Sequence, residues 1–265
     1  MIAAAFAVNS IDPAIVRKVV FSGAMTFVLI TSIYAFNAWG GKANDANNLR
    51  LNKLSNISLS GFMIISLALL IAAMAIGWVI DVMLIVYIAI IYLLWVLYSY
   101  PKIGLKSRPY LGTVLHFVAE VVHFNMIFSV FGQTGKESML ISAYFGLLFA
   151  GGHLNHESLD YEPDQQSEIV TGAVKAGQQT TDRSAFILFF VAWIYWLALW
   201  IANIAGLASL VIFTLAWVMH AGIYLFYFRK IERSINARLN YRKFYRAIYA
   251  LAGIALVVYR CFEII

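Results

Sequence analysis

The segment FAGGHLNHESLDYEPDQQSEI (residues 149–169) joins a long apolar run to a dense group of carboxylates. Five of the 13 acidic residues of the chain fall within the twelve positions from 157 to 168. The preceding run has the composition of a membrane helix, so the carboxylates would lie directly beside a bilayer surface. This junction therefore raises two questions: what fold the whole chain adopts, and what function the acidic residues have.

The composition of the chain answers the first question. Of its 265 residues 62% are hydrophobic and only 12% are charged, which lies outside the range of soluble domains. Several apolar runs reach the roughly 18 to 20 residues that cross a bilayer, and they lack the alternation of a membrane barrel. The single cysteine, Cys261, excludes internal disulfides and cysteine-based metal clusters. We predict an all-α polytopic membrane protein with one transmembrane helical domain, residues 1–265.

Apolar runs bounded by polar clusters predict about eight transmembrane helices. The expected spans are residues 15–39, 57–79, 81–100, 110–131, 138–155, 183–203, 206–228 and 241–261.

The distribution of basic residues predicts the orientation of these spans. The loops after the first, third, fifth and seventh spans hold fifteen of the 19 Lys and Arg residues, and the other side holds Arg17, Lys18, Lys136 and Arg260. Because cytoplasmic loops carry the excess of positive charge, we expect the first set in the cytoplasm and both termini outside. The most natural location is a bacterial inner (plasma) membrane. This bias explains the net charge of +6 without nucleic acid.

The acidic segment has a counterpart at the end of the first span. Asp160 and Asp164 are four residues apart, as are Asn37 and Gly41, and Gly41 and Asp45, so each set lies on one face if the helix continues. Such carboxylates repel one another unless a cation lies between them. An acidic loop that is merely solvated surface is the alternative reading.

Oxygen ligands without cysteine favour Mg²⁺, which bridges protein carboxylates to substrate phosphates. Basic residues expected on the same side of the membrane could neutralise the remaining oxygens of a diphosphate: Arg50, Lys106, Arg108 and Lys175.

Three segments taken in order carry a family resemblance. They are Asn37-x3-Gly41-x3-Asp45, the loop YSYPKIGLKSRPYLG, and the phrase NHESLDYEPDQQSEIVTGAVKAG. Together they resemble the two aspartate-rich motifs and the intervening loop of the UbiA superfamily of intramembrane prenyltransferases. The resemblance at the level of motifs covers about residues 30 to 180.

The resemblance implies a helical bundle around a central cavity that opens sideways to lipid, with cytoplasmic caps that hold Mg²⁺ and the diphosphate of an isoprenoid. By position, Asn37 and Asp45 would belong to the first metal motif, and Asp160 and Asp164 to the second. These four would be catalytic. The basic loop would contribute Lys106 and Arg108 to substrate binding.

Two departures from the family pattern bear on function. Ala38 and Gly41 stand where the family carries aspartates, and UbiA-type terpene cyclases are similar in having Gly or Ala at the middle position. The first metal motif also ends the first recognisable span instead of the second. We therefore expect the first helix of the family to be missing or reduced to the segment MIAAAFA.

A polar stripe lies inside the fourth span. His116, Glu120 and His123 occupy positions i, i+4 and i+7, and an ionisable residue at membrane depth is a candidate functional group. We expect them to face inward, where Glu120 could contact substrate or accept a proton. A structural hydrogen-bonded network and a transition-metal site remain open. His156, four residues before Asp160, would extend the substrate-binding face.

Three functions compete on the sequence alone. The first is a Mg²⁺-dependent prenyltransferase that ionises an isoprenoid diphosphate and transfers the prenyl group to an aromatic or lipid acceptor within the lipid bilayer. The second is a terpene cyclase that needs no acceptor. The third is a transporter, which is disfavoured because the carboxylates gather at one surface and not at mid-membrane.

Overall fold

The computed structural model describes residues 2–8, 12–44, 58–228 and 234–264. Within these ranges the ordered elements are all helical, and the part of the chain that is described contains no β-strand. The prediction of an all-α fold is confirmed.

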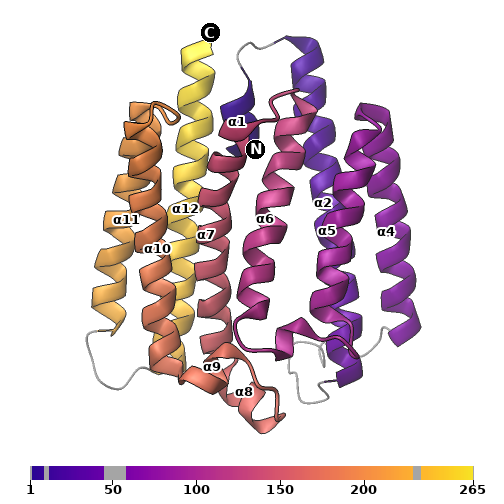
Figure 1. Cartoon of the computed structure of the whole chain (residues 1–265), viewed down its shortest axis with the longest axis vertical. Coiled ribbons are helices and arrows are strands. Elements are labelled where there is room, and N and C mark those ends of the chain that lie inside the picture. The colour runs from indigo at the N-terminus through magenta and orange to yellow at the C-terminus, as the bar shows by residue number, and fades with distance from the viewer. Residues whose placement is uncertain (1, 9–11, 45–57, 229–233, 265) are drawn as a thin grey trace.

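In the described part of the chain, eight long helices correspond one to one with the eight predicted spans (Figure 1). Several begin earlier or end later than the apolar run, because a helix can continue through a polar turn after it leaves the apolar region. The eight helices are α2 (Pro13–Asn44), α4 (Leu59–Ile80), α5 (Met83–Ser99), α6 (Leu111–Val130), α7 (Lys136–Leu159), α10 (Gln178–Ile201), α11 (Leu207–Phe228) and α12 (Ile235–Ile264).

Six of these helices are long and apolar enough to cross a membrane by length and composition alone. Helix α5 is apolar but has only 17 residues, and α7 combines an apolar centre with charged ends. Large hydrophobic side chains such as Phe27, Ile64 and Phe226 point outward, with 72%, 67% and 78% of their surface exposed. A surface of this kind is stable only against lipid, so the protein is an integral membrane protein.

Helix α7 lies between α6 and α10, and two glycines allow the close packing. A Cβ at Gly146 would lie 2.9 Å from the Phe117 ring of α6, and a Cβ at Gly151 would lie 3.0 Å from the Phe189 ring of α10. Small residues at such crossings let membrane helices approach closely. Helix α7 is therefore packed closely against both neighbours on the way to its acidic end.

The two ends of the bundle differ. Three short elements gather at what we call the cap end: η1 (Leu105–Ser107), α8 (Tyr161–Gln166) and α9 (Gly172–Ala176). Figure 1 shows α8 and α9 at this end, with α1 (Ile2–Ala7) and the C-terminal end of α12 at the opposite end. The segment expected to remain of the first family helix is thus one short helix, and Arg260 donates a hydrogen bond to the Ala5 carbonyl at 3.0 Å.

Candidate functional site

A cavity of about 340 Å³ lies at the cap end of the bundle. Its walls come from α2, α5 and α7, from the short helices η1 and α8, and from the segment that leads into α9. Residues of both predicted motifs and of the basic loop line it together: Asn37, Gly41, Lys106, His156, Asp160 and Asp164. Segments more than a hundred residues apart in the sequence therefore meet at one hollow.

The first motif reaches the cavity from the last part of α2. Asn37 is held by Ser99 of α5, whose hydroxyl donates to Asn37 Oδ1 at 3.0 Å. The two helices touch at this level, because a Cβ at Gly40 would lie only 2.3 Å from the Ser99 carbonyl oxygen. Ala38 and Gly41 also line the cavity and bring no carboxylate to it. The predicted ligand Asp45 and the predicted substrate contact Arg50 lie outside the described residues.

The second motif reaches the cavity from the end of α7 and from α8. Asp160 is the residue at which α7 ends and α8 begins, and Asp164 follows one turn later. His156 lies 2.8 Å from Asp160, measured from Nδ1 to Oδ2, and both side chains are partly exposed. The predicted i, i+4 relation between His156 and Asp160 therefore brings the two side chains into contact beside the cavity.

Asp164 shows the electrostatic character of the site. The pKa of its carboxyl is raised to about 7, chiefly by burial and next by the negative charge of Asp160. A hydrogen bond from Thr171 and the positive charge of Lys106 act in the opposite direction, and the neighbouring Glu157 adds to the repulsion. A group of carboxylates that repel one another in this way favours a bound cation.

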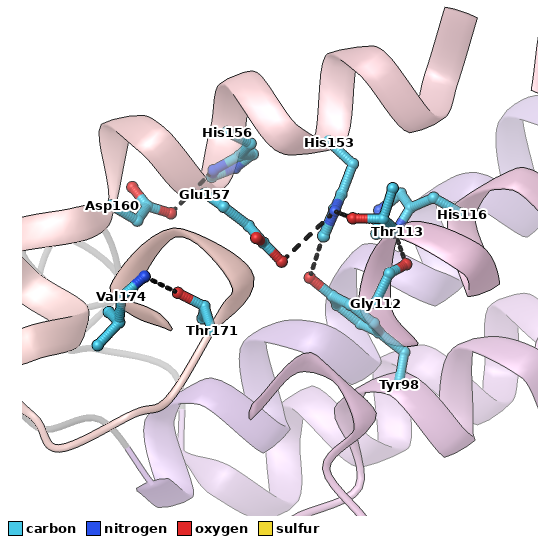
Figure 2. Close-up of polar contacts among 10 residues, drawn as sticks. All are labelled: Tyr98, Gly112, Thr113, His116, His153, His156, Glu157, Asp160, Thr171 and Val174. Atoms are coloured by element: carbon cyan, nitrogen blue, oxygen red, sulfur yellow. Dashed lines mark hydrogen bonds and ion pairs between the residues drawn. The ribbon is translucent and has the colours of Figure 1, made fainter. Parts of the chain in front are cut away.

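A second polar group extends from the cavity toward the interior of the bundle (Figure 2). The ring of His153 contacts the Tyr98 hydroxyl through Nε2 at 3.2 Å and the Thr113 hydroxyl through Nδ1 at 3.1 Å. Its Nδ1 is 3.7 Å from Glu157 Oε1, and its ring contacts the His116 ring at a tilt of 33°, with 3.8 Å between centroids. We call Tyr98, Thr113, His116, His153 and Glu157 the cavity cluster.

Two predicted substrate contacts do not reach the cavity lining in the described structure. Arg108 follows η1 and is exposed, whereas Lys106 of the same loop lines the cavity. Glu120 instead pairs with His123 at 3.2 Å, inside α6. No group of three His, Cys, Asp or Glu side chains in the described ranges could hold a metal, so the His116, Glu120 and His123 stripe forms no transition-metal centre there.

Several lining residues were not predicted as site residues. Tyr34 lies three residues before Asn37 on α2 and Tyr98 lies at the end of α5, while Glu157 and Thr171 flank the second motif. Helical spacing from Asn37 and Asp160 could have indicated Tyr34 and Glu157. Tyr98 has no such signal, because only contact between α5 and α7 brings it to the site.

The oxygen donors present fit a hard divalent ion that needs few protein ligands. Mg²⁺ commonly binds through one or two carboxylates and completes its shell with water and substrate phosphates. Asp160 and Asp164 can supply the carboxylates, and Asn37 of α2 can supply an amide oxygen. The acidic repulsion at Asp164 is the observation that this assignment explains.

Solved structures with a similar fold include a UbiA homologue from Archaeoglobus fulgidus bound to GPP and Mg²⁺. The TM-score is 0.74 at 18% identity, and the alignment covers 97% of this chain and 93% of that one. The same homologue bound to DMAPP and Mg²⁺ gives a TM-score of 0.72 with the same identity and coverage. A structure of digeranylgeranylglyceryl phosphate synthase gives 0.66 at 17% identity, covering 97% of this chain and 90% of that one.

A search of curated proteins gives no match. A family profile, described as the UbiA prenyltransferase family, matches residues 1–257 and so covers nearly the whole sequence. With the bundle, the cap end and the ordered motifs in agreement, the chain belongs to the UbiA prenyltransferase family.

Proposed function

We propose that this protein is a Mg²⁺-dependent intramembrane prenyltransferase, which ionises an isoprenoid diphosphate and transfers the prenyl group to an aromatic or lipid acceptor. The observation that carries the proposal is the shared cavity, where Asn37 of α2, Lys106 of η1 and the Asp160/Asp164 pair converge. The similar UbiA homologue was solved with GPP, DMAPP and Mg²⁺, which supports the same ligand class here.

The acidic and basic residues of the cavity have different proposed roles. Asp160, Asp164 and Asn37 would hold Mg²⁺, with the undescribed Asp45 completing the first motif. Bound Mg²⁺ supplies the charge neutralisation that lets diphosphate leave. Lys106 lines the same cavity and can hold a phosphate oxygen as a point charge, while His156 keeps Asp160 in place. Arg50 and Arg108 belong to the same proposed basic set, and Glu120 remains a proposed substrate contact deeper in α6.

A terpene cyclase is the second candidate, and one observation favours it. Ala38 and Gly41 line the cavity at positions where the family carries aspartates, and Gly41 stands at the middle position, where the cyclase branch that this sequence resembles carries Gly or Ala. In that reaction the allylic cation is captured by a double bond of its own chain. Neither reading changes the first step, the departure of diphosphate.

The orientation in the membrane follows from charge. We propose that the cap end faces the cytoplasm of a bacterial cell and that both termini lie outside, because fifteen of the 19 basic residues fall in the loops of one side. The proposed unit is one transmembrane domain of residues 1–265.

The experiment is a product assay with purified full-length protein in detergent or nanodiscs. Geranyl, farnesyl and geranylgeranyl diphosphates are incubated with Mg²⁺, with and without aromatic and lipid acceptors, and the organic extract is analysed. A prenylated product that forms only with an acceptor is the expected result. A hydrocarbon or terpene alcohol formed without acceptor favours the cyclase, and no release of diphosphate under any combination contradicts both.

A further inference from the structure

Glu157 occupies an unusual place in the cavity wall. It lines the cavity although only 5% of its surface is exposed, and neither carboxylate oxygen has a hydrogen-bond partner. The backbone amides of Gly172 and Ala173 face it from α9 without reaching hydrogen-bond geometry, and a Cβ at Gly172 would lie 2.8 Å from Oε2. A buried carboxylate without hydrogen bonds is unfavourable for folding, so its presence calls for a role in the reaction.

The neighbours of Glu157 are held in fixed positions. His153 touches Tyr98 through one ring nitrogen and Thr113 through the other, and it presents Nδ1 to the carboxylate at 3.7 Å. Gly112 lies under the His153 ring, where a Cβ would come within 3.1 Å of Cε1. Figure 2 shows the Glu157 side chain directed toward this ring and not toward Asp160. The surrounding groups therefore orient the carboxylate, whose two oxygens are enclosed by protein and accept no hydrogen bond.

The position of Glu157 along α7 suits a group that acts on the prenyl end of the substrate. It precedes Asp160 by three residues, which is about 4.5 Å along a helix axis at 1.5 Å per residue. Because α7 runs toward the cap end, Glu157 lies deeper in the bundle than the Asp160/Asp164 pair. A prenyl chain that runs from diphosphate at that pair into the apolar interior of the bundle would pass on the side where Glu157 lies.

We propose that Glu157 is the catalytic base that takes up the proton released when the new bond forms, with His153 and Tyr98 as positioning residues. The inference rests on the proposed function. The allylic C–O bond breaks and its electron pair leaves with the diphosphate. The acceptor atom, or an internal double bond, donates an electron pair to the cation. The proton that this nucleophile loses passes to the Glu157 carboxylate, which becomes a neutral acid and later returns the proton to the medium.

The test replaces Glu157 by Gln, which keeps the shape and removes the base. With whichever of the three prenyl diphosphates the wild-type protein consumes, Glu157→Gln is expected to lower the turnover rate by about 10²-fold or more. The KM for that diphosphate and the Mg²⁺ concentration for half-maximal rate should change less than about twofold. The melting temperature should be equal or higher. Glu162→Gln, on the exposed side of α8, is the matched control and should behave as wild type.

Each other outcome has a definite reading. Wild-type turnover in Glu157→Gln overturns the inference, and so does a loss that extra Mg²⁺ restores, since that would make Glu157 a metal ligand. Should the Gln variant fold poorly, Glu157→Asp retains a carboxylate about one methylene further back and should keep part of the activity. Failure of the wild-type protein to consume any prenyl diphosphate contradicts the proposed function itself. Failure of the inference about Glu157 is seen only in the Glu157→Gln variant, so the two outcomes can be distinguished.

Discussion

Two polar clusters flank the end of α7, and they differ in how their members are paired. On the α5 and α6 side is the cavity cluster, in which the Glu157 carboxylate has no hydrogen bond and His153 faces an open hollow. On the α10 to α12 side, Ser158 donates to Asp182 at 2.5 Å, and Arg238 donates to the other Asp182 oxygen at 2.9 and 3.2 Å. We call the second group, Ser158, Asp182, His220, Arg238 and Tyr241, the locking cluster.

Two neighbouring residues of α7 belong to the two different clusters. Glu157 and Ser158 point to different sides because successive residues of an α-helix are turned by about 100°. Gln178 of α10 also donates to the Ser158 carbonyl at 2.8 Å, so a hydrogen bond joins the end of α7 to α10. In the locking cluster His220 is fully buried, with Nε2 2.5 Å from the Tyr241 hydroxyl. The comparison teaches that hydrogen-bonded side chains hold α7 on the α10 side, whereas on the cavity side the Glu157 carboxylate has no hydrogen bond.

The largest effect is expected at the acidic pair. Asp160→Ala and Asp164→Ala each remove a carboxylate from the cavity, and we expect turnover to fall by about 10³-fold or more, which is about 4 kcal/mol in the barrier. Folded yield and melting temperature in detergent should be retained, since relief of carboxylate repulsion offsets lost contacts. Prenyl diphosphate consumption is the measurement. Near wild-type turnover in either variant would remove that residue from the mechanism.

The next effect is expected in the locking cluster and concerns stability. Asp182→Ala removes the carboxylate that pairs with the buried Arg238 guanidinium at 2.9 Å, and the loss should be about 3–5 kcal/mol of unfolding free energy. Thermal unfolding in one detergent is the measurement.

The matched control for this variant removes both charges. Asp182→Leu with Arg238→Met leaves no unpaired ion, so it should recover most of the stability that Asp182→Ala loses. A double variant as unstable as the single one would show that the ion pair itself, and not the stranded charge, sets the stability.

The smallest effects come from a matched pair of hydroxyl deletions, one in each cluster. Tyr241→Phe removes the partner of a fully buried histidine and should lower unfolding free energy by about 1–2 kcal/mol with little change in activity. Tyr98→Phe frees His153 beside an open cavity, where water can replace the hydroxyl, so stability should change by about 0.5 kcal/mol or less. Its turnover should fall about tenfold. Equal effects of the two substitutions on both quantities would remove the distinction between the clusters.

Much of the fold and part of the site could be predicted from the sequence. The eight helices follow from apolar runs of membrane length, a local property that needs no knowledge of neighbours. Asn37, Lys106, His156, Asp160 and Asp164 were predicted as site residues and share one cavity, because ordered motifs and helical spacing carry their positions. Their roles stay predictions until variants are assayed.

Other features were decided by packing between helices far apart in the chain. Lys106 and Arg108 are both basic and only two residues apart, yet only Lys106 lines the cavity. Glu120 satisfied every sequence criterion for a buried functional acid, and the structure pairs it with His123.

By itself the sequence determined that the chain is a helical membrane bundle with acidic motifs at one end, since length, apolarity and charge are properties of each segment alone. Only the tertiary structure decided that Glu157 faces His153 and Tyr98 across a cavity while Ser158 faces Asp182. Hydrogen bonds and burial depend on which side chains meet across helices, and a single residue step along α7, about 100° of rotation, separates Glu157 at the cavity from Ser158 at Asp182.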